Sequence, residues 1–279
     1  MRFGDLGIVG ASTAGIESWF RVSPPGVAFD AGRGVAELSG VRRVFLSHGH
    51  LDHSLGVPFQ LSQRNFAEDG PPTRIFCPAE IAGDLEEFVQ AAERLERVTY
   101  RYEIVGLGAG DRVELGRGFA VESFATDHVV PSLGFDLLRT RKRLASRYVG
   151  LPPDEIASLK RQGVEVEQRF EVRSLSYCGD TGPAVLDQRQ QLFEAEVLLL
   201  ECTFLGDQSI DKGPLYKHVH VADLIERQDR FQNAHVVLLH LSRRHQASEL
   251  REILERKAPR LAERVVVFPA EAAEEPNAR

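Results

Sequence analysis

Cysteine is scarce in this sequence, and long apolar runs are missing. The three cysteines among 279 residues, Cys77, Cys178 and Cys202, have no Cys-x-x-Cys spacing. This excludes a disulfide framework, and we expect all three to be buried like small apolar residues. No apolar run reaches the roughly 18 residues that a membrane span needs. The first residues lack the basic and apolar segments of a signal peptide, so we expect a cytoplasmic protein without a membrane partner.

Acidic residues outnumber basic ones, which gives a formal net charge of -7. This argues mildly against nucleic-acid binding by the whole surface. One stretch is nevertheless basic: Arg139, Arg141, Lys142, Arg143 and Arg147. A local patch of this kind can bind phosphates on an acidic protein. The length fits a single domain covering residues 1–279, in which we expect the acidic tail at about residues 270–279 to be disordered.

Short apolar segments alternate with amphipathic ones along the chain. Strands are predicted at residues 16–22, 26–30, 43–46, 100–104, 119–125, 133–138, 172–177, 197–200, 234–239 and 264–268. Helices are predicted at residues 79–95, 152–162, 221–231 and 246–256, and after residue 50 with Leu55, Phe59 and Phe66 near one face. Strands interrupted by helices in two halves predict two packed sheets with helices outside, an αβ/βα four-layer sandwich of the α/β class.

A histidine-rich segment directly follows the predicted strand 43–46. It reads Ser-His-Gly-His-Leu-Asp-His over residues 47–53. Imidazole and carboxylate are good ligands for zinc and similar ions, whereas burying several such rings without partners would be unfavourable. We therefore predict that His48 and His50 bind one metal ion and that Asp52 and His53 bind a second ion beside it.

Three later strands end in residues that can complete this site. His128 follows strand 119–125, Asp180 follows strand 172–177, and His240 ends strand 234–239. We predict that His128 completes the first metal site, that His240 completes the second, and that Asp180 bridges both. The alternatives are a core histidine at 128 and a turn aspartate at 180. Two cations that share a water would lower its pKa and could clamp a phosphoryl group. Asp30 either orients a histidine or is a plain turn residue.

These motifs resemble those of the metallo-β-lactamase superfamily. The segments that carry the likeness are Phe-Asp-Ala-Gly at 29–32, the histidine motif at 47–53, Thr-Asp-His at 126–128 and Gly-Asp-Thr at 179–181. Within the superfamily, the chain resembles the ribonuclease Z family of tRNA 3′-processing endonucleases, most of all its short plant-nuclear type. Residues 128–135, 142–163, 200–204, 217–220 and 240–245 carry this second resemblance. It extends from about Leu6 to Phe268.

The resemblance implies an endoribonuclease that uses a metal-bound hydroxide to remove the 3′ trailer from tRNA precursors. It implies two Zn²⁺ per chain, although iron or manganese would also suit the ligands, and a homodimer. Asp52 would accept a proton as well as bind metal, and Glu201 with His218 would protonate the departing 3′ oxygen. His220 is the rival for that role. Arg244 would hold a phosphate or be an ordinary solvated arginine.

Several positions depart from the family pattern. Lys217 replaces the glycine before the acid histidine, Leu200 replaces the first histidine of the His-Glu-Ala-Thr-Phe loop, and His245 replaces a tyrosine. No Gly-Pro-rich arm lies between His128 and Asp180, so we expect that arm to be missing. The basic stretch lies where it would begin. We expect Arg141 and Lys142 to bind substrate there, with a solvated charged face as the alternative.

Two other functions compete with this interpretation. The first is a hydrolase of the same fold that acts on small phosphodiesters, such as cyclic or short nucleotides, or on esters and lactones. Glu201, His218 and Arg244 favour phosphates over esters. The second is a non-catalytic RNA-binding scaffold. Scaffolds of this kind lose metal ligands, whereas all seven predicted ligands are present here.

Overall fold

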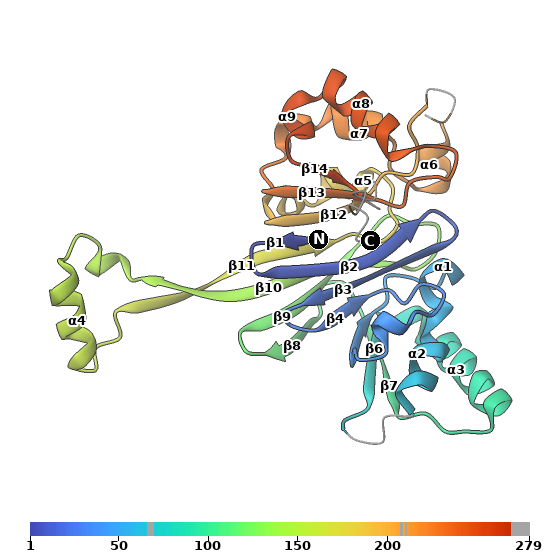
Figure 1. Ribbon diagram of the computed structural model, residues 1–279, viewed down its shortest axis with the longest axis horizontal. Helices are drawn as coiled ribbons and strands as arrows, with labels where there is room; N and C mark the ends of the chain where they lie inside the picture. Colours follow the sequence, from blue (N-terminus) through green and yellow to red (C-terminus); the bar gives the residue numbers. More distant parts are fainter. Residues whose placement is uncertain (66–69, 207–208, 210, 269–279) are drawn as a thin grey trace, which may run out of the picture.

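The computed structural model describes residues 1–65, 70–206, 209 and 211–268 (Figure 1). Phe66 and the acidic tail, for which the sequence analysis makes predictions, lie outside this part of the chain. Within it, no helix combines the length and the apolar composition that crossing a bilayer requires.

Two seven-stranded sheets form the centre of the molecule. The first sheet has the order β1 (Arg2–Phe3), β2 (Leu6–Thr13), β3 (Glu17–Ser23), β4 (Val27–Phe29), β5 (Arg43–Phe45), β6 (Thr73–Pro78) and β7 (Tyr102–Leu107). The second has the order β14 (Val265–Val267), β13 (His235–Leu239), β12 (Val197–Glu201), β11 (Glu167–Tyr177), β10 (Leu133–Leu144), β9 (Phe119–Ala125) and β8 (Arg112–Gly116). Both sheets mix parallel and antiparallel pairs, because β4 to β7 and β11 to β14 run parallel.

Helices cover the outer face of each sheet (Figure 1). Those beside the first sheet are α1 (Leu51–Ser54), α2 (Gly56–Asn65) and α3 (Ala82–Glu96). Those beside the second are α5 (Ala184–Gln188), α6 (Lys212–Tyr216), α7 (Val221–Glu226), α8 (Ala247–Lys257) and α9 (Pro259–Ala262). Short 3₁₀ turns are η1 (Ala36–Leu38), η2 (Ala79–Ile81), η3 (Ser146–Tyr148), η4 (Gln190–Glu194) and η6 (Gln228–Arg230). Separate apolar clusters fill the space between the sheets and between each sheet and its helices. The predicted four-layer sandwich is confirmed.

Aromatic side chains join the two sheets. Phe29 of the first sheet stacks on Phe135 of the second, with 6.0 Å between ring centroids, and lies 5.4 Å from the ring of Tyr177. Phe45 packs edge-on against Phe135 at 5.4 Å. All four side chains are fully buried. Their strands end at the edge where the histidine-rich segment begins, so this rigid packing fixes the base of the site.

The sequence analysis missed or misplaced some elements. It overlooked β2, β6 and β8, and the helix after residue 50 is divided at Leu55 into α1 and α2. Leu55 and Phe59 do not form a buried face, because they are 41% and 42% exposed. Val57 and Leu61, four residues apart on α2, are buried instead. The actual buried face is therefore rotated by two positions from the predicted one.

A long arm projects from the body between His128 and Asp180, although the Gly-Pro-rich arm expected to be missing is not there. Strands β10 and β11 stay paired outward as far as Leu144 and Glu167, and the tip carries α4 (Pro153–Arg161) (Figure 1). The arm is a two-stranded ribbon and not a Gly-Pro-rich loop. Its outer half is solvated and charged, with no apolar pattern to mark a strand. The predicted strand therefore ended at Leu138.

A buried carboxylate connects the base of this arm to the body. Asp136 on β10 is fully buried and lies 2.6 Å from Nε of Arg173, 2.5 Å from Arg189 and 2.5 Å from the Ser176 hydroxyl. We predict that Asp136→Ala lowers the free energy of unfolding by about 3 kcal/mol, because it leaves two guanidinium groups without their shared anion. Urea denaturation measures this. The exposed Glu80→Ala should change stability by less than about 0.5 kcal/mol; equal small effects of both substitutions would contradict the prediction.

Candidate metal centre and active site

The predicted ligands meet at one edge of the sandwich, because each follows the end of a strand. His48 follows β5, His128 follows β9, Asp180 follows β11, and His240 follows β13. The backbone also joins the two sheets here, since Leu133 N–H donates to the Ser47 carbonyl at 2.9 Å. Gly179, with φ of 60°, allows Asp180 to approach the first sheet, because a Cβ at 179 would lie 2.7 Å from Cβ of Ser47.

The structure arranges these side chains in the two predicted groups. One group contains His48, His50, His128 and Asp180, and the other contains Asp52, His53 and His240. Within each group, one ligand atom from every member lies within 4.8 Å of the others. Asp180 also contacts the second group, with its carboxylate oxygens 3.4 Å from His53 Nε2 and 3.3 Å from His240 Nε2.

Several buried polar atoms of this cluster face one another without forming hydrogen bonds. Among the described residues, none forms a hydrogen bond with Nε2 of His48, His53 or His240, or with Oδ1 of Asp180. Leaving each such atom unsatisfied would cost about 1–3 kcal/mol. Contacts of 3.3–3.9 Å between nitrogen and oxygen match neighbouring ligands of an ion bound at about 2.1 Å. The residues present therefore fit divalent cations.

Hydroxyl groups set the orientation of two of these histidines. The Ser47 hydroxyl donates to Asp30 Oδ2 at 2.8 Å and lies 2.9 Å from His48 Nδ1. The Thr203 hydroxyl donates to Glu201 Oε2 at 2.6 Å and lies 3.0 Å from His240 Nδ1. Because each hydroxyl proton is committed to an oxygen, each hydroxyl accepts from the Nδ1–H of its histidine. Both Nε2 lone pairs consequently face the cluster.

Asp30 orients a histidine and is not a plain turn residue. Its Oδ2 lies 2.6 Å from His53 Nδ1, and it also accepts from Ser47 N–H at 2.6 Å and from the Tyr177 hydroxyl. Asp30 and His240 have φ of 57° and 58°, a region that residues other than glycine rarely occupy. Backbone strain of this kind concentrates at functional sites.

The cluster carries an unusual balance of charges. Burial lowers the pKa of His48 well below its usual value, and the neighbouring His53 adds to that effect. Burial also lowers the pKa of His50 and of His128, although Asp180 opposes it. For Asp180, burial raises the pKa, but His240 and His53 outweigh it and hold the pKa well below the usual range. For His53, burial lowers the pKa, but Asp180 and Asp30 outweigh it and raise the pKa well above the usual value. The neutral imidazoles of His48, His50 and His128 and the ionised Asp180 carboxylate are already in the forms that bind metals.

Asp52 lies at the open side of the cluster. Its Oδ2 accepts from Gly15 N–H at 3.0 Å and lies 3.6 Å from His240 Nε2 and 3.7 Å from His53 Nε2. Burial raises the pKa of Asp52, but the contact with His240 and the charge of His53 lower it further than burial raises it. Its side chain is 15% exposed. Asp52 is thus an ionised carboxylate that can reach solvent or a substrate.

Glu201 and His218 form a second pair beside the metal cluster. His218 Nδ1 lies 2.6 Å from Glu201 Oε1, and Glu201 is fully buried. Glu201 also accepts from Thr181 N–H at 3.1 Å. Burial lowers the pKa of His218, but the charge of Glu201 outweighs it and raises the pKa to about 9. The His218 ring lies 5.4 Å from that of His240. This pair can deliver a proton next to the metal cluster.

His220, the rival of His218, has contacts of a different kind. Its Nδ1 accepts from Ala222 N–H at 3.0 Å, and its Nε2 lies 3.1 Å from the Gly206 carbonyl. Asp223 bonds back to the His220 N–H, which completes a capping box at the start of α7. Both ring nitrogens of His220 are therefore engaged in structure.

The departures from the family pattern have local explanations. Lys217 adopts a left-handed conformation with φ of 53°, which a glycine would also adopt, and its Nζ lies 2.6 Å from Asp127 Oδ1. Its carbonyl lies 3.3 Å from His128 Nδ1. Leu200 is fully buried in an apolar cluster. His245 bonds Glu249 at 3.1 Å.

The predicted substrate-binding residues are not gathered at the cluster. Arg141 stands eight positions beyond Leu133 on β10, which places it about 26 Å further along the strand. It pairs with Glu196 at 2.7 Å, and Lys142 pairs with Glu167 at 3.4 Å. Arg244 follows His240 by four positions and lines a hollow together with Ala14, the residue before Gly15. Sequence reasoning missed Ser47 and Thr203, because a hydroxyl next to a ligand carries no signal until the fold supplies its partner.

Comparison with known proteins agrees with this geometry. Residues 23–241 match the family model described as a beta-lactamase superfamily domain. The Arabidopsis thaliana protein tRNase Z TRZ1 is 30% identical over 261 residues, which are 92% of this chain and 93% of that protein. Its chloroplastic relative tRNase Z TRZ2 is 30% identical over 262 residues, 93% of this chain and 74% of that protein.

A solved structure extends the likeness to the fold. The short form of human tRNase Z (ELAC1) superposes with a TM-score of 0.61 at 18% identity, covering 94% of this chain and 95% of the human one. The relatives match nearly the whole chain, and the shared motifs converge on one cluster. This chain therefore belongs to the ribonuclease Z (tRNase Z) family of the β-lactamase superfamily.

Proposed function

We propose that the protein is a metal-dependent endoribonuclease that removes the 3′ trailer from tRNA precursors. The observation that carries the proposal is the pairing of Glu201 with His218 beside the seven-residue metal cluster. A cluster alone would serve any hydrolase of this fold. A buried acid pair next to it serves a leaving group that needs a proton, as a ribose 3′ oxygen does. The relatives named tRNase Z support the choice of substrate.

The proposed cofactor is a pair of Zn²⁺ ions. His48, His50 and His128 would hold one ion, Asp52, His53 and His240 would hold the other, and Asp180 would contact both. When bound, two such cations lower the pKa of a shared water and polarise phosphoryl oxygens. The mixture of imidazole and carboxylate suits zinc, and iron or manganese would also fit it.

The chain's own groups then position and protonate the substrate. Asp52, fixed by Gly15 N–H, is placed to accept a proton at its carboxylate. His218 is held through Nδ1 by Glu201, so its Nε2–H is free to protonate the departing 3′ oxygen. Thr203 contacts both Glu201 and His240 and so holds the acid pair in a fixed relation to a metal ligand.

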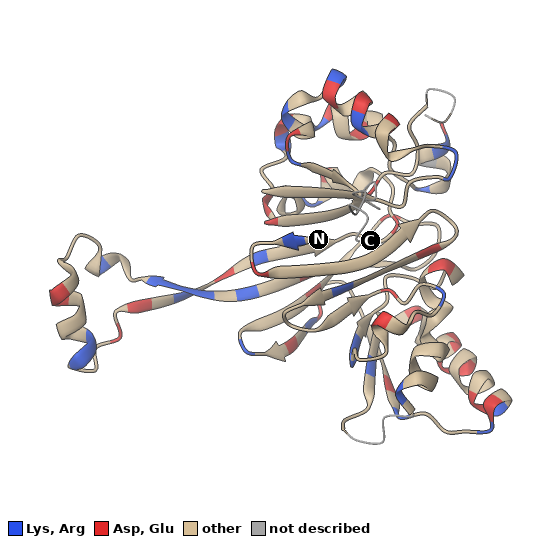
Figure 2. Ribbon diagram, in the orientation of Figure 1, with Lys and Arg blue, Asp and Glu red and all other residues tan. Residues whose placement is uncertain are grey.

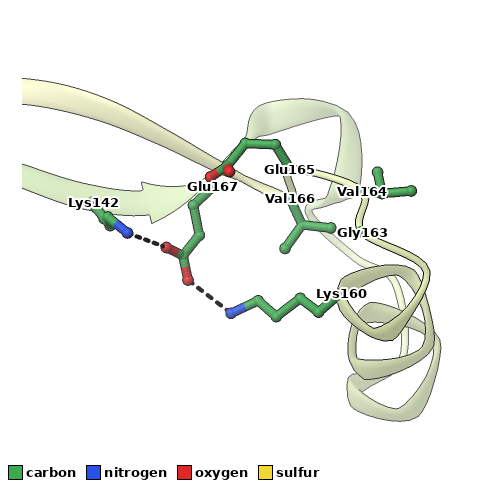
Figure 3. Close-up of a pocket in the computed structure, with 7 residues that line it drawn as sticks. All are labelled: Lys142, Lys160, Gly163, Val164, Glu165, Val166 and Glu167. Atoms are coloured by element: carbon green, nitrogen blue, oxygen red, sulfur yellow. Dashed lines mark hydrogen bonds and ion pairs between the residues drawn. The ribbon is translucent and has the colours of Figure 1, made fainter.

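The projecting arm supports binding of a large RNA. Figure 2 shows Lys and Arg along β10 and at the tip of the arm. At the tip, Lys142 and Lys160 share the carboxylate of Glu167 and line a hollow of about 300 Å³ (Figure 3). Glu167 offsets one of these two positive charges. Arg143, over the ring of Phe170, and Arg169, opposite Lys142 on the ribbon, are exposed and remain for phosphates.

We predict that the double charge reversal Arg143→Glu and Arg169→Glu raises KM for a tRNA precursor about tenfold and weakens its salt dependence. The physical reason is the loss of phosphate contacts far from the cleaved bond. Steady-state kinetics at two salt concentrations measure both effects. Lys257→Glu, an exposed reversal on α8, is the matched control. An unchanged KM in the arm variant would remove the arm from RNA binding.

The proposal includes a homodimer. Its support is an exposed apolar row at helical spacing, Leu51, Leu55 and Phe59, which are 62%, 41% and 42% exposed. Exposed apolar rows of this kind favour association. Light scattering on the purified protein tests it, with a monomer mass at micromolar concentration as the contradicting result.

Cleavage of a tRNA precursor by the purified, zinc-loaded protein tests the proposed function. The expected products are a tRNA ending in a 3′ hydroxyl and a trailer that begins with a 5′ phosphate. A protein that hydrolyses bis(p-nitrophenyl) phosphate but leaves the RNA intact would instead be a hydrolase of small phosphodiesters. Tight RNA binding without hydrolysis of either substrate would indicate a scaffold.

A further inference from the structure

Two adjoining hollows open beside α6 and the loop after β13. One has a volume of about 640 Å³ and the other about 410 Å³, and they share Phe204, Lys212, Ser242 and Arg244 as lining residues. The larger one also includes Tyr216 and Arg243. Cavities of roughly 300–1,000 Å³ hold small ligands and single nucleotides. None of the seven metal ligands lines either hollow, so they form a separate compartment.

This compartment borders the proposed active site on the side of the acid pair. The Phe204 ring lies 6.1 Å from the ring of His218. Ala14, on the opposite wall, precedes Gly15, whose N–H donates to Asp52. A substrate atom that accepts a proton from His218 would therefore have its attached group at the mouth of the hollow.

The cations of the compartment differ from three cations of β10. Over the described residues, Lys212, Arg243 and Arg244 form no ion pair, and the two arginines are exposed. Arg139, Arg141 and Lys142 all pair with carboxylates. Three unpaired cations next to a metal cluster make a strongly positive mouth that attracts phosphate groups. Figure 2 shows basic residues at α6 and on the neighbouring loop.

Two aromatic rings complete the lining. Phe204 is half-buried, and Tyr216 is 52% exposed, which is high for a large aromatic side chain. Free cations combined with aromatic faces are the means by which proteins hold single-stranded nucleic acid, because every base can stack on a ring. An ester or lactone substrate would use neither feature.

We propose that this compartment is a nucleotide subsite for the residue that carries the departing 3′ oxygen. Its base stacks on Tyr216 and Phe204, and the phosphate on its 5′ side pairs with Lys212, Arg243 and Arg244. The choice between the two nucleotides at the cleaved bond follows from His218. Its ring borders the compartment through Phe204, so the compartment takes the nucleotide that receives the proton. The proposal rests on the proposed function for the direction of the RNA, whereas the nucleotide binding itself is independent of cleavage.

Calorimetric titration of the metal-loaded protein with small nucleotides tests the subsite. Adenosine 3′-monophosphate presents the base together with a phosphate at the metal cluster, and adenosine 5′-monophosphate presents the base together with the phosphate that the three cations would hold. We expect the 3′ compound to bind about tenfold more tightly than the 5′ compound. Tyr216→Ala should remove about tenfold of the affinity for the 3′ compound, as loss of one stack would. Tyr216→Phe, which keeps the ring, and Leu215→Ala, an exposed neighbour, are the matched controls.

A second ligand tests the contribution of the cations to binding. Adenosine 3′,5′-bisphosphate should bind about tenfold more tightly than the 3′-monophosphate, and Lys212→Ala should reduce that gain. An affinity for either monophosphate that Tyr216→Ala leaves intact would overturn the proposal. Cleavage of a tRNA precursor by the wild-type protein is measured in parallel. If the protein binds the nucleotides but does not cleave the precursor, only the proposed function is contradicted. If it cleaves the precursor but does not bind the nucleotides, only the subsite is contradicted.

Discussion

Replacing Asp180 with alanine is expected to lower kcat/KM for RNA cleavage by about a thousandfold, which corresponds to about 4 kcal/mol of transition-state stabilisation. Asp180 is the carboxylate that both halves of the cluster share, with contacts to His48, His53 and His240 at 3.9, 3.4 and 3.3 Å. Without it, His48 loses its carboxylate neighbour. Nε2 of His53 and of His240 then retains only Asp52 as a carboxylate neighbour. Steady-state kinetics on a tRNA precursor and on bis(p-nitrophenyl) phosphate should show losses of similar size.

A second prediction for Asp180→Ala concerns its melting temperature. Ions that bind only the folded state stabilise it, so a chelator should lower the melting temperature of the wild-type protein. The shift should be much smaller for Asp180→Ala, because its site binds metal weakly. Asp84→Ala, an exposed carboxylate on α3, is the control for the loss of one negative charge. An Asp180→Ala protein with wild-type activity and a wild-type chelator response would contradict the role of this residue.

Replacing His218 with alanine is expected to lower the hydrolysis of two kinds of substrate to very different extents. Cleavage of RNA should fall by about 10²- to 10⁴-fold, because the ribose 3′ oxygen departs poorly without a proton. Hydrolysis of bis(p-nitrophenyl) phosphate should fall far less, because p-nitrophenolate leaves without protonation. Glu201→Gln should show the same pattern to a smaller extent, since Glu201 holds His218 at 2.6 Å.

His220→Ala is the matched control for this experiment. It removes an imidazole two positions away, which caps α7 and does not face the cluster. We expect a stability loss of about 1 kcal/mol from the missing cap, with equal effects on the two substrates. The assignment of the acid would be wrong if His218→Ala lowered the hydrolysis of both substrates equally. It would also be wrong if His220→Ala lowered RNA cleavage much more than hydrolysis of bis(p-nitrophenyl) phosphate.

Sequence alone predicted the parts of the site that lie in short linear motifs. His48 to His53 stand on one loop, so their spacing already indicates metal ligation. His128, Asp180 and His240 were predicted because each ends an apolar strand, and parallel strands of one sheet bring such ends together. The fold followed from the same alternation of strands and helices. These are local patterns that do not depend on knowing distant contacts.

The rest depended on contacts that no local pattern encodes. Thr203 orients His240 across 37 positions of chain, and Asp30 reaches Tyr177 across 147. An arm built from strands was not predicted, because β10 continues beyond Leu138 with solvated charged residues, where apolar alternation stops. Arg141 was assigned to substrate from its charge alone, whereas the fold supplies Glu196 as its partner. Free and paired cations look identical in a sequence.

The central claim is that seven side chains from both sheets enclose two metal ions. Elemental analysis of the purified protein, together with variants from each group, tests it most directly. We predict two ions per chain in the wild-type protein and about one in either His128→Ala or His240→Ala, since each substitution removes a ligand from a different ion. A wild-type protein that binds fewer than one ion per chain after loading with zinc, or two single variants that both retain two ions, would contradict the account.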